Sequence, residues 1–150
     1  MKIIAQNKKA FHDYEILDQI EAGIVLTGDE VKSIRAGHVS LIGSYANIHK
    51  NELFLINCTI AIYAQAYQKR EEDKYRSRKL LVNRRELNRM AGDISRKGVT
   101  ILPLKIYLNE RGLVKVTLGI GKHKKAADKR SALKERDIKR ETMRELKTKY

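Results

Sequence analysis

The longest alternation of apolar and polar positions in the sequence begins at Tyr14. Apolar residues of one parity, interrupted only at Asp18, are Tyr14, Ile16, Ile20, Ala22, Ile24 and Leu26. A period of two predicts a long half-buried strand. Gly28 ends it, and Thr27 with Glu30 forms a capping box that opens a short helix. Gly37 can supply the left-handed residue that closes this helix.

Two hairpins are predicted further along the chain. Residues 44–49 and 53–57 form the first around Lys50-Asn51, and residues 104–108 and 114–120 form the second around residues 109–112. A third apolar run covers residues 59–63, residues 67–79 form a charged loop, and residues 80–82 form a short buried stretch. Pro103 opens the second hairpin, where an edge position would tolerate its missing N–H.

A second helix begins at a cap made by Asn83 and Glu86, and Gly98 can close it. Its apolar residues follow helical spacing on one face: Leu87, Met90, Ala91 and Ile94. The whole pattern predicts a mainly β protein, a small antiparallel barrel of the oligonucleotide-binding type. We expect about six strands and two or three short helices.

The C-terminal segment has a different composition. Residues 122–150 contain neither Gly nor Pro and hold 12 Lys and Arg against 5 Asp and Glu, which is a surplus of +7 out of +14 for the chain. Its large apolar residues form no helical stripe. We therefore divide the chain into a barrel domain, residues 1–121, and a basic tail, residues 122–150, disordered when free and helical on an anionic partner. A solvated extension with no specific role is the alternative.

Charge and candidate chemistry favour binding over catalysis. A pI of about 9.9 indicates a polyanionic partner. Cys58 is alone, the four histidines lack metal-ligand spacing, and no P-loop or Gly-x-Ser-x-Gly motif occurs. We therefore expect a non-enzymatic RNA-binding protein without cofactor or metal. We also expect a monomer. A general rRNA-binding protein is one alternative, and a nuclease is another, although it would need converging carboxylates.

No signal peptide or membrane-length apolar run occurs in this sequence, which predicts a cytoplasmic protein. Four tyrosines in or beside basic stretches are candidates for stacking on bases: Tyr63, Tyr67, Tyr75 and Tyr107. Packing in the core or at the barrel rim is the preferred interpretation for Tyr14 and Tyr107.

Several blocks of the sequence resemble the SsrA-binding protein (small protein B) family. They cover nearly the whole chain in order, namely residues 7–14, 21–24, 28–37, 76–81 with Glu86, 98–107, and 128–130 with the basic tail. The resemblance implies an oligonucleotide-binding-type barrel that binds the tRNA-like domain of transfer-messenger RNA. It also implies delivery of that RNA to stalled ribosomes, with elongation factor Tu involved indirectly.

The resemblance also assigns residues. It implies RNA contacts at Asn7, Glu21 and Leu81, with Lys8, Arg76 and Lys79 as basic neighbours. It implies that the tail enters the decoding centre of the small ribosomal subunit and follows the vacant mRNA channel; the tail residues concerned are His123, Lys124, Lys125, Asp128, Lys129 and Arg130.

Three positions depart from the family pattern. His123 replaces a usual Gly, and Ala127 replaces the usual stacking His or Tyr, so His123 is a candidate to replace that ring. The loop at Lys74-Tyr75 lacks a common Pro.

Overall fold

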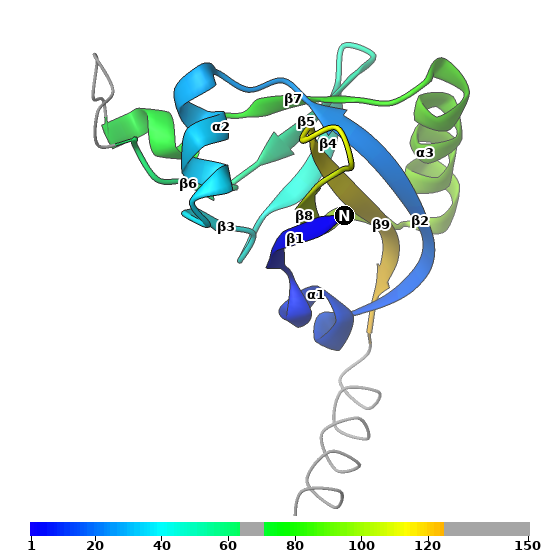
Figure 1. The fold of residues 1–150 in the computed structure, drawn as a ribbon. Helices are drawn as coiled ribbons and strands as arrows, with labels where there is room; N and C mark the ends of the chain where they lie inside the picture. Colours follow the sequence, from blue (N-terminus) through cyan, green and yellow to red (C-terminus); the bar gives the residue numbers. More distant parts are fainter. Residues whose placement is uncertain (64–70, 125–150) are drawn as a thin grey trace, which may run out of the picture.

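Six strands in the described part of the chain close into an antiparallel ring (Figure 1). The computed structural model describes residues 1–63 and 71–124. Around the ring the strands are β4 (Tyr45–His49), β5 (Glu52–Ile56), β7 (Arg78–Leu81), β2 (Tyr14–Ile24), β9 (Val114–His123) and β8 (Thr100–Leu108). β8 pairs back with β4 through Ala46 and Ile101, which closes the barrel. The expected class, a small antiparallel barrel of mainly β structure, is confirmed.

Alternating side chains fill the interior of this ring. Ile20 and Ala22 of β2 and Val116, Leu118 and Ile120 of β9 are all buried, as the period-two pattern predicted. β2 and β9 pair from Tyr14 opposite His123 to Gly23 opposite Lys115, the longest pairing in the sheet. Full burial of one such aliphatic side chain stabilises the fold by about 1.5–3 kcal/mol.

The helices begin and end at the predicted caps. In α2 (Gly28–Arg35) the capping box of Thr27 and Glu30 is present, and Gly37 follows with φ of 85°. In α3 (Arg84–Lys97) the Asn83 side chain accepts from the Glu86 N–H, and Gly98 adopts the left-handed conformation. The predicted apolar face of α3 is wrong at Ala91, which is exposed, while Met90 is fully buried.

Several short elements have no counterpart in the predicted pattern. They are β1 (Lys2–Gln6), α1 (Lys8–Asp13), β3 (Val39–Ser40) and the 3-10 helix η1 (Glu71–Tyr75). β3 pairs with β6 (Thr59–Ile60), which lies at the start of the predicted apolar run 59–63. β4 and β1 pair with successive parts of β8: β4 pairs near its start, at Ile101, and β1 pairs with residues 105–108. α1 then packs against the barrel through Ala10, with Leu102 and Leu104. β1 thus extends the sheet beside β8, and α1 packs on the outside of the ring.

The prediction for Pro103 is wrong. Pro103 lies inside β8, a central strand that pairs with β1, β4 and β9, and it is fully buried. The register of β8 against β9 shifts between Pro103 and Lys105. A bulge is the other place where a strand tolerates the missing N–H. Residues 101–104 are all buried because both faces of β8 are covered here: Ile101 packs in the core of the ring, and α1 covers Leu102 and Leu104.

Candidate nucleic-acid interface

Two rows of side chains cross the outer face of the barrel. One row joins Leu81 of β7, Gly23 of β2, Lys115 of β9 and Tyr107 of β8. The neighbouring row joins Glu21 of β2, Thr117 of β9, Lys105 of β8 and Gln6 of β1. We call these eight residues the outer-face rows.

The outer-face rows bring Glu21 and Leu81 together. The side chain of Leu81 lies over Gly23, because a Cβ at Gly23 would be 3.3 Å from the Leu81 Cβ. Leu81 is 50% exposed, so the predicted burial of residues 80–82 is wrong at this position. Glu21 is exposed two residues before Gly23, on the same face of β2. An exposed leucine beside a carboxylate is a surface that can meet both an apolar and a hydrogen-bonding group.

Tyr107 supports Glu21 from within the sheet. Tyr107 is buried at its place on the outer face, which confirms the preference for packing in the core or at the barrel rim. Burial and a hydrogen bond to the Glu21 carboxylate raise the pKa of Tyr107 to about 12. The phenol therefore stays protonated and can donate to Glu21 at neutral pH. The carboxylate is held in place while its other lone pairs stay accessible.

Asn7 has a structural role in this structure. It is 5% exposed; its Nδ2 donates to the Pro103 carbonyl at 3.0 Å and its Oδ1 accepts from the Ala10 N–H at 3.3 Å. Asn7 thus caps α1 and fixes it to β8. Lys8, the first residue of α1, is exposed beside it. Any effect of Asn7 on RNA binding is therefore expected to act through the position of α1.

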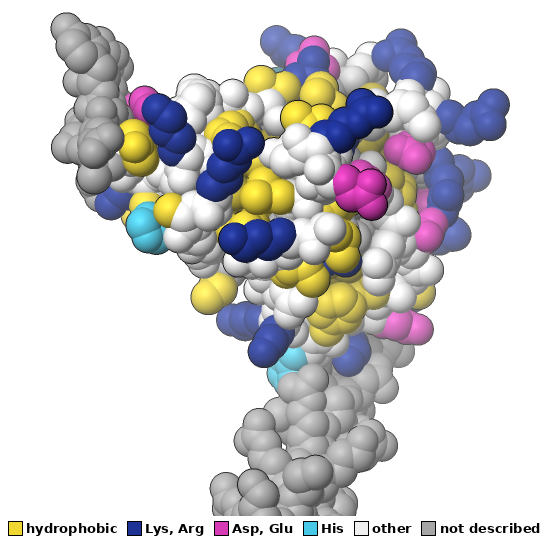
Figure 2. Space-filling model, viewed as in Figure 1, with side chains coloured by type: hydrophobic (Ala, Val, Ile, Leu, Met, Phe, Trp, Pro, Cys, Tyr) yellow, Lys and Arg dark blue, Asp and Glu magenta, His cyan; other side chains and the backbone are white. Residues whose placement is uncertain are grey.

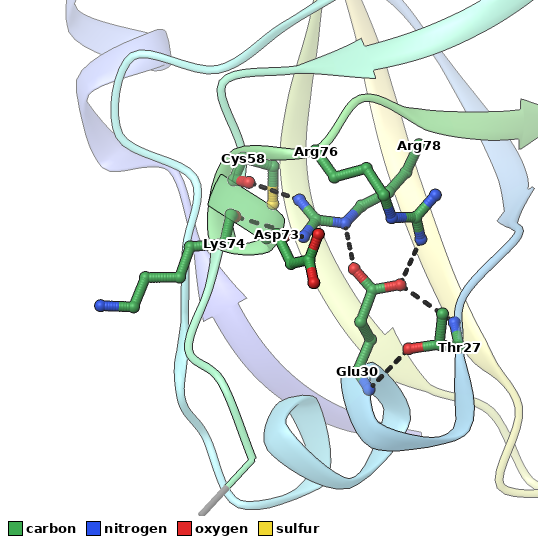
Figure 3. Close-up of polar contacts among 7 residues, drawn as sticks. All are labelled: Thr27, Glu30, Cys58, Asp73, Lys74, Arg76 and Arg78. Carbon is green, nitrogen blue, oxygen red and sulfur yellow. Dashed lines mark hydrogen bonds and ion pairs between the residues drawn. The ribbon is translucent and has the colours of Figure 1, made fainter. Parts of the chain in front are cut away.

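The basic residues near β7 are engaged within the protein (Figure 3). Arg76 forms an ion pair with Glu30, and Lys79 approaches Glu52 at 3.4 Å between exposed side chains. Arg78, which the pattern placed in a charged loop, is a fully buried residue of β7 whose Nε donates to Glu30 at 2.6 Å. The hydrogen bonds from Thr27, Arg78 and Arg76 lower the pKa of Glu30, although its burial acts in the opposite direction.

The root of the predicted tail belongs to the folded part. His123 is the last residue of β9, two residues beyond the expected boundary, and its ring meets Tyr14 edge-on with centroids 5.0 Å apart. The Lys124 N–H donates to the Asp13 carbonyl, and its Nζ donates to the Phe11 carbonyl. The remaining tail residues of interest, Lys125, Asp128, Lys129 and Arg130, lie outside the described residues, as do Ala127 and Tyr67.

The tail root and Leu81 lie at opposite ends of β2. His123 is opposite Tyr14, whereas Leu81 is opposite Gly23, nine residues further along the strand. That separation corresponds to roughly 30 Å of strand. Figure 2 shows Lys and Arg side chains interspersed with exposed hydrophobic ones on the viewed face, together with several acidic groups.

Several residues of this face escaped the sequence analysis. Phe11, 46% exposed on α1, and Lys105 and Lys115 on the outer-face rows are among them. Phe11 follows a basic run, so its sequence context was the available signal. Of the tyrosines proposed to stack, Tyr75 is 57% exposed and Tyr63 lies under Lys32 at 5.1 Å.

Residues 1–63 and 71–124 contain neither a metal-binding cluster nor a membrane-spanning helix. No three His, Cys, Asp or Glu side chains there come together as a metal site. No helix of this part of the chain has the length and hydropathy needed to cross a bilayer.

Comparison with known proteins gives a consistent result. The family model described as SmpB protein matches residues 4–148. An SsrA-binding protein of Coprothermobacter proteolyticus is 47% identical over 150 residues, covering 100% of both chains. One from Thermoanaerobacter pseudethanolicus is 50% identical over 149 residues, covering 99% of this chain and 94% of the relative.

A solved structure is similar as well. It is described as "tmRNA-SmpB: a journey to the center of the bacterial ribosome" and shares 50% identity with a TM-score of 0.66. The match covers 81% of this chain and 85% of the solved one. The match in sequence along almost the whole length, together with the barrel, shows that this chain belongs to the SmpB protein family.

Proposed function

We propose that this protein binds the tRNA-like domain of transfer-messenger RNA through its outer face and delivers it to stalled ribosomes for trans-translation. The observation that carries the proposal is the pairing of Glu21 and Leu81 on one exposed face, in a chain whose relatives are named SsrA-binding proteins. A generic phosphate-binding surface has no use for a carboxylate facing RNA. A carboxylate can accept hydrogen bonds from base amino groups, which gives selectivity.

The basic side chains supply affinity in this proposal. Lys8, Lys105 and Lys115 border the outer face and can contact phosphates. Arg76 and Lys79 retain 41% and 42% side-chain exposure and can add long-range attraction, although each is paired with a glutamate. The protein performs no chemical step; it acts in the cytoplasm as a monomer, without cofactor, and elongation factor Tu joins through the RNA.

The tail provides the second half of the proposed function. Its surplus of positive charge suits the rRNA-lined decoding centre and mRNA channel of the small subunit. Because a helix rises 1.5 Å per residue, the tail needs an unoccupied channel before it can become ordered there. Tail binding would then report the absence of mRNA. His123, Lys124, Lys125, Asp128, Lys129 and Arg130 would act in this step.

The decisive test of RNA selectivity is competitive binding near 0.15 M salt, where the screening length is about 8 Å. Labelled transfer-messenger RNA competes against ordinary tRNA and an unrelated duplex. We expect a preference of about tenfold or more, equivalent to about 1.4 kcal/mol. Equal competition by all three RNAs would refute the proposal and favour a general rRNA-binding protein. Metal-dependent cleavage of the RNA would favour the nuclease instead.

Two variants test the named residues. Glu21→Ala is expected to weaken RNA binding without unfolding, whereas Glu15→Ala, an exposed carboxylate at the far end of the same strand, should leave it unchanged. A chain ending at Lys124 preserves β9 and the contacts with α1, and should keep RNA affinity but lose tagging on stalled ribosomes. Near-complete tagging by that truncated chain would remove the tail from the mechanism.

A further inference from the structure

An open pocket of about 290 Å³ lies on the outer face between α1 and the sheet. Its floor includes Leu104 and Thr117, which are 3% and 9% exposed. The Leu104 side chain packs directly against Gly119, where a Cβ would be only 2.8 Å from Leu104 Cδ1. Any larger residue at position 119 would displace this side chain. The volume lies near the lower limit of small-ligand sites, roughly 300–1,000 Å³. A single nucleotide is a ligand of suitable size.

One wall of this pocket is an aromatic ring. Phe11 is 46% exposed, while its neighbour Ala10 is 4% exposed and packs on Leu102 and Leu104. Successive residues of a helix point about 100° apart, so burying Ala10 leaves the Phe11 side chain at the surface, where it lines the pocket. An exposed ring at the side of a pocket offers the flat surface on which an unpaired base stacks.

The flanking polar groups suit a base and not an apolar ligand. Gln6 of β1 and Gln19 of β2 are exposed and line the pocket. Each amide carries donors and acceptors, so it can pair with the edge of any base. Gln6 also lies in the row that leads to Glu21 through Lys105 and Thr117. The pocket is therefore continuous with the proposed RNA surface.

Two cations stand at the pocket where phosphates would lie. Lys8 and Lys105 both line it. Within residues 1–63 and 71–124, several other basic residues form ion pairs with Asp or Glu, but Lys8 and Lys105 do not. The Lys105 Nζ lies 5.6 Å from the centre of the Tyr107 ring, which holds the charge on the outer face. A bound anion would offset the positive charge of these two lysines.

We propose that this pocket binds one unpaired nucleotide of the RNA, with its base stacked on Phe11 and its phosphates beside Lys8 and Lys105. This proposal rests on the proposed function and identifies a nucleotide subsite within it. The amides of Gln6 and Gln19 contact the edge of the base. The RNA strand then continues along the row toward Glu21.

The test combines protein variants with abasic RNA. The tRNA-like domain of transfer-messenger RNA is prepared with one unpaired nucleotide at a time replaced by an abasic site. We expect Phe11→Ala to weaken binding of the intact RNA by about 5- to 150-fold, the range for loss of one stacked base. One abasic position should weaken binding by the wild-type protein and have no further effect on Phe11→Ala, because both changes remove the same contact.

Controls separate the pocket from the rest of the surface. Phe11→Tyr keeps the stacking ring and should bind like wild type, and Ile42→Ala, at an exposed apolar residue outside the pocket, should do the same. Unchanged affinity of Phe11→Ala, or additive losses at every abasic position, would overturn the subsite while leaving the proposed function standing. A wild-type protein without preference for this RNA would refute the proposed function, and with it the ligand named for the pocket.

Discussion

Arg78 should be the most costly single charge to remove from this barrel. It is fully buried, and its guanidinium makes four hydrogen bonds: to Glu30 at 2.6 Å, to the Cys58 carbonyl at 2.6 Å, and to the carbonyls of Asp73 and Lys74 at 3.0 and 3.2 Å (Figure 3). Through these bonds, Arg78 of β7 is joined to α2, to the loop that follows β5, and to η1. Arg78→Met keeps an unbranched apolar stem and removes every donor.

The expected loss follows from what remains after the substitution. Breaking a buried ion pair by removing one partner costs about 3–5 kcal/mol, because the other charge stays desolvated. Three carbonyl groups lose their donor as well, and water can replace only part of that loss. At roughly 2–4 °C per kcal/mol for a chain of this size, the melting temperature should fall by about 6–20 °C.

Arg76→Met is the matched control, since Arg76 pairs with the same carboxylate but its side chain is 41% exposed. Exposed pairs contribute about 0–1 kcal/mol. Urea unfolding followed by circular dichroism at neutral pH compares the two variants. If Arg78→Met loses no more stability than Arg76→Met, the buried network does not hold η1 and α2 to the barrel, and the reasoning is refuted.

Four further outcomes are expected. The lowered pKa of Glu30 gives stability that is complete above its unfolded value of 4.5 and is lost as pH falls through the folded value, so Glu30→Gln should flatten the acid limb of a stability–pH curve. Burial raises the pKa of Cys58 to about 11, so iodoacetamide near pH 8 should alkylate the thiol only after urea unfolding. Asn7→Ala removes the cap of α1 and should cost about 0.5–2 kcal/mol in a thermal melt, with no loss expected only if the cap is dispensable. Gly119→Ala places a Cβ against Leu104 and should cost about 1–3 kcal/mol by the same assay; a neutral result would mean that the leucine repacks freely.

Local patterns in the sequence predicted most elements because their causes are local. The capping groups of α2 and α3 lie within three residues of each other, and the Lys50-Asn51 turn has positive φ at both residues, as its hairpin requires. Period-two alternation placed Ile20 and Ala22 inside the barrel correctly. Family membership was also accessible, since it rests on blocks spread along the whole chain.

The sequence missed β1 and α1 because five- and six-residue elements carry too little periodicity to be distinguished from a loop. β1 is stabilised by pairing with β8, and α1 is held by the hydrogen bond between Asn7 and Pro103, two residues that lie 96 positions apart in the sequence. The pocket between α1 and the sheet forms only because β1 and α1 pack against β8 and supply Gln6, Lys8 and Phe11 to its lining.

What the sequence determined by itself was the class of the fold, the boundaries of its capped helices and the excess of positive charge that indicates an RNA partner. The tertiary structure alone decided which residues are available at the surface. Arg78 became a core residue and Leu81 an exposed one in the same strand, and Asn7 became a buried cap. Alternation states that the two faces of a strand differ, but the partners on each face are set by long-range pairing and ring closure, and those contacts determine burial.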